Sequence, residues 1–252
     1  MQKLHYLKAL GIQSWQLRHS KNSNTMITIN HTVNNETDSF TSVNTVSFIE
    51  NAGETPQINR VSLIKNEWET LQTNIATCTA CGLDKTRTQT VFGVGDRNAD
   101  LMIIGEAPGF YEDKAGEPFV GRAGQLLNAM LQAIGIAREQ VYIANILKCR
   151  PPNNRDPLIN EVDLCTPFLK KQIALINPKL LLGLGRIAAH YLLDTKAPLG
   201  QLRGQLTQYG NTPLLITYHP AYLLRSPSDK RKAFQDLQLV HRTLQSIVAG
   251  ES

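Results

Sequence analysis

GEAPGFYEDKAGEPFVGRAGQLL, residues 105–127, is the stretch that decides the fold, because it separates an apolar run from an apolar helical pattern. The run before it, residues 101–104, is Leu-Met-Ile-Ile and predicts a buried strand. The stretch holds five glycines and two prolines, and glycine loses more conformational freedom on folding than any other residue. A strand, a long loop and a helix in this order typically bind a ligand at the carboxyl end of the strand. We therefore interpret the stretch as a functional loop.

The rest of the chain from Val61 alternates between predicted strands and predicted helices. The strands are expected at 100–104, 141–147, 180–184 and 214–217. The helices are expected at 123–134, 161–176, 186–193 and 230–248, after a first helix that presents Ile64, Trp68, Leu71 and Ile75 on one face. A hairpin is expected over 202–217, with its turn at 209–211. This alternation predicts a parallel sheet with helices on both faces.

Composition restricts the class of protein. The 252 residues are 42% hydrophobic and 19% charged, as in an ordinary globular protein, and the net charge of +5 permits nucleic acid as a partner. The sequence shows neither a membrane-spanning apolar run nor a signal-peptide core, so we expect a cytoplasmic protein. Residues 1–60 are rich in Ser, Thr and Asn, and we expect a disordered tail there, followed by a folded domain at 61–250.

Four cysteines are present, and they form one candidate metal centre: Cys78, Cys81, Cys149 and Cys165. The first two have C-x-x-C spacing, which lets two sulfurs bind one centre from a single turn. Disulfides are not expected in a reducing cytoplasm, and buried free thiols are the alternative. Spacing alone does not separate zinc from an iron–sulfur cluster.

Polar residues follow three different predicted strands. Gly105-Glu106, Asn145 and His219-Pro220 each lie at or near the carboxyl end of a strand. In a parallel sheet these ends share one edge, so we expect the three segments to form one crevice.

Four motifs and the cysteine order resemble the family-4 uracil-DNA glycosylases, the iron–sulfur-containing branch of that superfamily. The motifs are GEAPG-x-x-ED at 105–113, GEPFVGRAGQLL at 116–127, YIANILKCRPPNNRDP at 142–157 and HPAYLLR at 219–225. The resemblance covers residues 65–245. It departs at Phe110-Tyr111, where the family usually has a small or acidic pair, so a shifted base preference is one alternative. A non-catalytic nucleic-acid-binding or redox-sensing module is another.

The resemblance implies an α/β fold, a three-layer αβα sandwich around a mainly parallel four-stranded sheet. It implies a monomer that binds uracil-containing DNA and hydrolyses the N-glycosidic bond of a flipped-out deoxyuridine, the first step of base excision repair. It also implies a structural [4Fe–4S] cluster on Cys78, Cys81, Cys149 and Cys165. Uracil would be bound by Gly105, Glu106, Ala107, Phe119, Asn145 and His219. Ala107 stands where other superfamily members have a water-activating aspartate.

The chemistry of these residue types suits the implied roles. The Asn145 amide can accept from N3–H of uracil and donate to O4, a pattern that cytosine reverses. Phe119 would stack on the base, and His219 would donate to O2, where negative charge develops. The carboxylate that assists catalysis is either Glu106 or Glu112.

Two further segments are candidates for contact with DNA. Arg150 and Arg155 lie on a proline-stiffened loop that suits phosphate contacts. Leu223 or Leu224 would wedge into the space left by the flipped base, and Arg225 would hold a phosphate.

Overall fold

The computed structural model describes residues 60–250, which belong to one compact unit. The predicted tail lies outside the described residues, except for Arg60, which begins helix α2 (Arg60–Ala76). Among the described residues, no helix is both long and apolar enough to cross a membrane.

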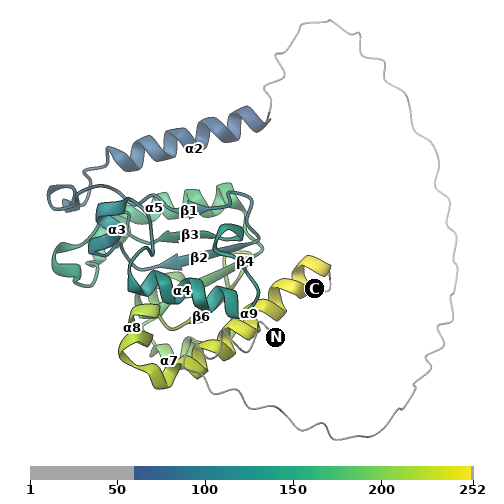
Figure 1. Cartoon of the computed structure of the whole chain (residues 1–252). Coiled ribbons are helices and arrows are strands. Elements are labelled where there is room, and N and C mark those ends of the chain that lie inside the picture. Colours follow the sequence, from purple (N-terminus) through teal and green to yellow (C-terminus); the bar gives the residue numbers. More distant parts are fainter. Residues whose placement is uncertain (1–59, 251–252) are drawn as a thin grey trace, which may run out of the picture. The chain divides into compact units, whose positions relative to one another are not determined.

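One mixed sheet of six strands organises the described part of the chain, with the order β1-β3-β2-β4-β6-β5 (Figure 1). The four central strands are parallel: β3 (Tyr142–Asn145), β2 (Leu101–Gly105), β4 (Leu180–Leu184) and β6 (Thr212–Thr217). These are the four strands that the sequence predicted. Antiparallel edge strands extend the sheet from four strands to six: β1 (Val94–Gly95), which was not predicted, and β5 (Leu206–Tyr209). β5 and β6 form the predicted hairpin.

Apolar side chains alternate between two cores, one on each face of the sheet. On β2, Leu101 and Ile103 belong to one core, whereas Met102 and Ile104 belong to the other. Successive side chains of a strand point to opposite faces, so a strand buried on both faces must be apolar throughout. This is why LMII carries no polar residue. The arrangement is the predicted three-layer sandwich.

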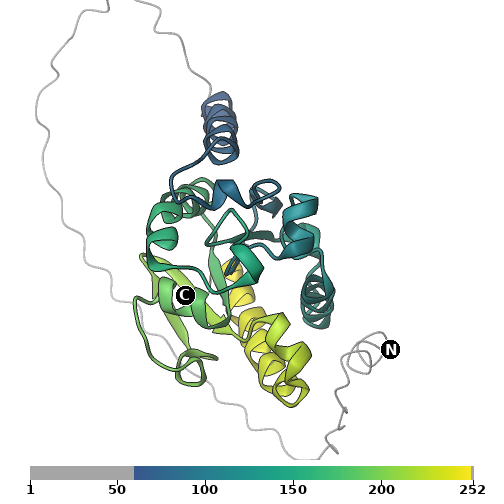
Figure 2. The same ribbon diagram turned by 90° about the vertical axis from the view of Figure 1, so that its left-hand side faces the viewer.

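Helices of the first core cover one face of the sheet, and helices of the second cover the other (Figures 1 and 2). The first group comprises α4 (Arg122–Ala133), α8 (Pro220–Arg225) and α9 (Lys230–Ala249). The second group comprises α2, α5 (Ile159–Ile176) and α6 (Gly185–Leu192). Two short helices, α3 (Phe110–Ala115) and α7 (Leu199–Leu202), and four short 3-10 turns complete the described chain. The 3-10 turns are η1 (Leu83–Lys85), η2 (Arg138–Gln140), η3 (Pro152–Asn154) and η4 (Pro227–Asp229).

A buried carboxylate fastens α9 to the sheet. Asp236 is 2% exposed and accepts hydrogen bonds from Thr217 Oγ1 of β6 at 2.7 Å and from Arg203 Nε at 3.0 Å. Burial raises the pKa of Asp236, and the bonds from Thr217 and Arg203 oppose that rise. The three side chains fix the last helix against the edge hairpin.

Candidate active site

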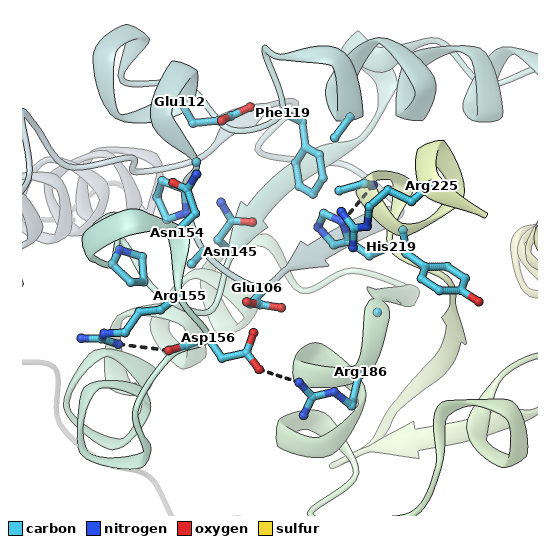
Figure 3. Close-up of a pocket in the computed structure, with 18 of the residues that line it drawn as sticks. Glu106, Glu112, Phe119, Asn145, Asn154, Arg155, Asp156, Arg186, His219 and Arg225 are labelled. Carbon is cyan, nitrogen blue, oxygen red and sulfur yellow. Dashed lines mark hydrogen bonds and ion pairs between the residues drawn. The ribbon is translucent and has the colours of Figure 1, made fainter. Parts of the chain in front are cut away.

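A pocket of about 510 Å³ opens at the carboxyl ends of the four parallel strands (Figure 3). Glu106 follows β2, Asn145 ends β3, Gly185 follows β4 and His219 follows β6. The predicted convergence of three strand ends is therefore confirmed, and a fourth strand end joins them. The site residues predicted from the sequence that line this pocket are Glu106, Ala107, Glu112, Phe119, Asn145, Arg155, His219 and Arg225.

Asn145 lies at the floor of the pocket with an unsatisfied amide oxygen. Its side chain is 2% exposed, and its Oδ1 has no hydrogen-bond partner. That oxygen lies directly against Gly105, where a β-carbon would overlap it. A buried acceptor without a donor is costly in a folded protein. The oxygen is thus available to a ligand that brings an N–H group into the pocket.

Phe119 forms a wall beside Asn145 and is held by an uncommon backbone conformation. Its φ is 55°, in the left-handed region that residues other than glycine rarely adopt. The ring is 6% exposed and lies 5.6 Å, centroid to centroid, from the His219 ring. Gly124 of α4 permits this conformation, because a β-carbon there would overlap the Phe119 carbonyl. The pocket therefore has a rigid aromatic wall.

His219 is held as a neutral imidazole in one tautomer. Its Nδ1 accepts a hydrogen bond of 3.1 Å from the Ala221 amide, so the ring proton resides on Nε2. The pKa of His219 is lowered to about 4, chiefly by burial and also by the charge of Arg225, while Glu112 opposes the shift. At neutral pH the ring is therefore a hydrogen-bond donor through Nε2 without a positive charge.

Two carboxylates, Glu106 and Asp156, lie together with Arg186 across the pocket from Phe119 (Figure 3). Arg186 Nη2 pairs with Asp156 Oδ2 at 2.6 Å. The pKa of Glu106 is raised to about 7, chiefly by burial and also by the charge of Asp156, while Arg186 opposes the rise. Glu106 therefore changes its protonation state near neutral pH, as a group that participates in proton transfer requires.

Glu112, the rival carboxylate, organises the loop of Phe119. Its Oε1 accepts hydrogen bonds from the amides of Val120 at 3.1 Å and Gly121 at 3.0 Å. Glu112 also lines the pocket. The side chain thus bridges α3 and the segment that carries the aromatic wall.

The candidate DNA contacts fall into two groups. Arg225 lines the pocket, and Leu224 is 37% exposed beside it. Leu223, in contrast, is 1% exposed and packs in the core with α4 and α9, so its predicted contact with DNA is wrong. The apolar positions of α8 alternate between core and surface, and the sequence alone did not reveal which leucine faces inward.

Of the two predicted loop arginines, only Arg150 has a guanidinium that is not held in a bidentate ion pair. Arg155 donates to both carboxylate oxygens of Glu161, at 2.8 and 2.6 Å. Such a fork-to-fork pair satisfies the guanidinium, so Arg155 holds the loop to α5, and a main role in phosphate binding is not supported. Arg150 Nε donates to Asn154 Oδ1 at 2.7 Å on an exposed surface.

Cys149 lies within electrostatic range of the other three cysteines, and Cys165 also lies within range of Cys81. Burial raises the pKa of the Cys149 thiol, Arg87 lowers it, and the nearby Cys81 and Cys78 raise it. Burial also raises the pKa of Cys165 to about 11, with Lys148 opposing the rise and Cys149 and Cys81 adding to it.

Two N–H groups point at cysteine sulfurs, from Arg87 Nη1 to Cys149 Sγ at 3.0 Å and from the Lys148 amide to Cys165 Sγ at 3.3 Å. Within residues 60–250, no three His, Cys, Asp or Glu side chains converge closely enough to hold a single metal ion.

Sequence reasoning missed a set of pocket residues that lie on one loop or near the starts of helices α6, α7 and α8: Asp156, Gly185, Arg186, Leu199, Ala221 and Tyr222. The signal for Gly185 and Arg186 was present, because they directly follow the predicted strand at 180–184. The others depend on the path of a loop and on the placing of the short helices α7 and α8, which no periodicity encodes.

Comparison with known proteins places this geometry in a family. The model of the uracil DNA glycosylase superfamily matches residues 92–238. The type-4 uracil-DNA glycosylase of Thermotoga maritima is 43% identical over 168 residues, covering 65% of this chain and 88% of the relative. That of Archaeoglobus fulgidus is 42% identical over 174 residues, covering 66% and 87%. A type-5 uracil-DNA glycosylase of Pyrobaculum aerophilum is 27% identical over 146 residues, covering 51% and 64%.

The superfamily match spans both the sheet and every strand end of the pocket. The chain belongs to the type-4 uracil-DNA glycosylases of this superfamily.

Proposed function

We propose that the protein is a monofunctional uracil-DNA glycosylase that removes uracil from DNA in base excision repair. Its type-4 relatives carry that activity in their names. The observation that carries the proposal for this chain is Asn145, whose buried amide oxygen lacks a donor beside the wall formed by Phe119. Uracil supplies the missing donor at N3–H, whereas cytosine presents an acceptor there.

The target nucleotide must leave the duplex to reach this floor, which costs about a few kcal/mol of unstacking. Phe119 returns part of that cost by stacking on the base, a contact worth about 1–3 kcal/mol. Cytosine in the same position would leave polar groups unpaired, which is a strong source of discrimination. Recognition of the base therefore resides in Asn145 and Phe119.

Bond cleavage separates charge between the base and the sugar. The C1′–N1 bond breaks with both electrons remaining on uracil, and the oxygen of water forms the new bond to C1′ while one water proton is released. His219 donates from Nε2 toward the developing charge on O2, and it does so as a neutral ring that costs no protonation step. A carboxylate near the sugar, Glu106 or Glu112, stabilises the cationic sugar and orients the water.

A uracil-excision assay tests this function. The protein is incubated with a uracil-containing oligonucleotide, and abasic sites are converted to strand breaks with alkali. We expect His219→Ala to lower the rate by about 100- to 1000-fold, the usual effect of removing one transition-state hydrogen-bond donor, and Asn145→Ala to lower it strongly because the base is no longer read. Asn98→Ala and His241→Ala, outside the pocket, serve as matched controls. Binding of DNA by the unsubstituted protein without strand breaks would refute the enzyme and favour a binding module.

We also propose that Cys78, Cys81, Cys149 and Cys165 hold a [4Fe–4S] cluster. Such a cluster places its four thiolates on different iron atoms, so its ligands need not converge on one point, which fits the geometry of the four thiols. The N–H groups of Arg87 and Lys148 that point at sulfur fit charged thiolates. The cluster would hold the segment after α2 against α5, and no catalytic step requires it.

Metal analysis of anaerobically purified protein tests the cofactor. We expect about four iron and four sulfide per chain, with loss of both in Cys165→Ser. A colourless protein with one zinc would overturn the assignment while leaving the excision assay unaffected.

A further inference from the structure

Two adjacent aromatic side chains at the start of α3 are exposed. Phe110 is 42% exposed and Tyr111 is 64% exposed. Their rings meet edge to face, with centroids 5.4 Å apart. Aromatic rings gain most of their stabilisation from burial, so an exposed pair marks a surface that contacts another molecule. This pair is also where the chain departs from the usual motif of its family.

Two cations lie over the Phe110 ring and come from different segments. Lys114 Nζ is 4.6 Å from the ring centroid, and the Arg150 guanidinium carbon is 5.1 Å from it. Lys114 belongs to α3, whereas Arg150 belongs to the loop between β3 and α5. Phe110 therefore serves as a support for two positive charges, and Tyr111 presents the more exposed ring.

This surface adjoins the pocket. Gly109 and Glu112, on either side of the aromatic pair in sequence, line the pocket. Tyr111 packs beside Gly121, where a β-carbon would lie 3.3 Å from its ring. Arg150 is bonded to Asn154, another pocket residue. A DNA strand that delivers a nucleotide to the pocket thus passes close to both rings and both cations.

We propose that Phe110, Tyr111, Lys114 and Arg150 form a platform that binds an unpaired nucleotide adjacent to the extruded uracil. The neighbouring base stacks on Tyr111, and the phosphates contact the cations held over Phe110. Exposed aromatics interleaved with cations are the usual means of binding single strands. In a duplex the neighbouring base stays paired with the opposite strand and stacked on its far neighbour, so it reaches Tyr111 only by giving up those contacts, and the platform favours single-stranded substrate. The proposal rests on the proposed function and specifies its substrate.

Binding of full-length protein to a single-stranded uracil oligonucleotide, and to its duplex, tests the platform. We expect Tyr111→Ala to weaken single-strand binding by about 5- to 100-fold, the range for loss of one base–aromatic stack, with a smaller loss on the duplex. Tyr111→Phe keeps the ring and should bind like the unsubstituted protein. Leu206→Ala removes another exposed apolar side chain, 55% exposed, from the edge strand β5 and serves as the control.

A fluorescent base reports stacking directly. With 2-aminopurine next to uracil in the single strand, its emission should be quenched by the unsubstituted protein and by Tyr111→Phe, but not by Tyr111→Ala. Lys114→Gln and Arg150→Gln should each lower the slope of log K against log salt by about 0.7. Equal affinity of Tyr111→Ala and the unsubstituted protein, or an equal loss on both substrates, would overturn the platform.

The two proposals fail separately. If no uracil is released but Tyr111→Ala still loses single-strand binding, the enzyme is refuted and the platform stands as a DNA-binding surface. If uracil is released and the Tyr111 variants all bind alike, the enzyme stands and the platform is refuted.

Discussion

His219 and Glu106 face the same pocket, and burial shifts the pKa of each in the direction that favours its uncharged form. The pKa of His219 falls to about 4 and that of Glu106 rises to about 7. The stability that neutral His219 contributes is complete above its ordinary pKa of 6.5 and is lost as the pH falls toward 4. For Glu106 the contribution is complete below its ordinary pKa of 4.5 and is lost as the pH rises through 7. The pocket is thus most favourable to folding at mildly acidic pH.

Glu106→Gln should therefore stabilise the protein in a pH-dependent way. The amide copies the protonated carboxyl, so we expect little change at about pH 5 and a gain of about 2 kcal/mol at about pH 8.5. Urea unfolding at both pH values measures the difference. Glu69→Gln on the exposed face of α2 is the control. An equal gain at both pH values would show that charge burial is not the cause.

Asn145 and His219 were identified from sequence because each directly follows an apolar run, and the strand ends of a parallel sheet meet. The hydrogen bonding of these two side chains was not predictable in the same way. The unpaired Oδ1 of Asn145 depends on Gly105, where a β-carbon would overlap it, and the bonded Nδ1 of His219 depends on the Ala221 amide 3.1 Å away. The residue types indicate which chemistry is possible, whereas the local contacts decide which atom of each side chain donates a hydrogen bond and which accepts one.

At the scale of elements, α4 and the Phe119 segment are matched in shape. The helix approaches the Phe119 carbonyl so closely at Gly124 that no side chain fits between them. Periodicity predicted α4 to within one residue at each end, but it did not predict this approach, because a missing side chain leaves no apolar signal.

Gly124→Ala should disturb the aromatic wall of the pocket. We expect a loss of about 1–3 kcal/mol in the free energy of unfolding, typical of overpacking, together with a loss of excision activity, since the backbone of Phe119 must shift. Gly200→Ala is the matched control, because a β-carbon at that position meets nothing within 4 Å. Thermal unfolding and the excision assay check both effects. Unchanged activity in a stably folded Gly124→Ala protein would show that the wall tolerates displacement.

Short elements were harder to predict than long ones. α3 and α8 have six residues each and carry no full helical period. His219 begins α8 by accepting from the Ala221 amide, so the same contact caps a helix and sets a tautomer.

At the scale of the whole molecule, the two cores and their sheet were predictable, and the fastening between distant segments was not. Asp236, Arg203 and Thr217 join α9, the turn before β5 and the end of β6. In the sequence they are three ordinary polar residues, and a helical pattern alone would assign Asp236 to the surface. Only the tertiary fold brings these three residues into contact.

Asp236→Ala should be strongly destabilising. Removal of one partner from a buried charged pair costs about 3–5 kcal/mol, and Arg203 is left with its side chain only 16% exposed. Asp163→Ala on the exposed side of α5 is the control. Urea unfolding near neutral pH provides the measurement. A loss no larger than that of the control would mean that solvent replaces the carboxylate without penalty.

Lys148 occupies the short segment between the base-reading side chain and the cysteines. It is 1% exposed, its Nζ donates to the Asn145 carbonyl at 2.8 Å and to Gln172 Oε1 at 2.6 Å, and its amide donates to Cys165 Sγ. The segment from Asn145 to Cys149 is therefore held in place by Lys148, through its Nζ at the Asn145 carbonyl and through its amide at Cys165 Sγ. An inserted or deleted residue here would move the uracil-reading amide and a cysteine sulfur together. Between 145 and 149 the chain therefore has no freedom to change its length.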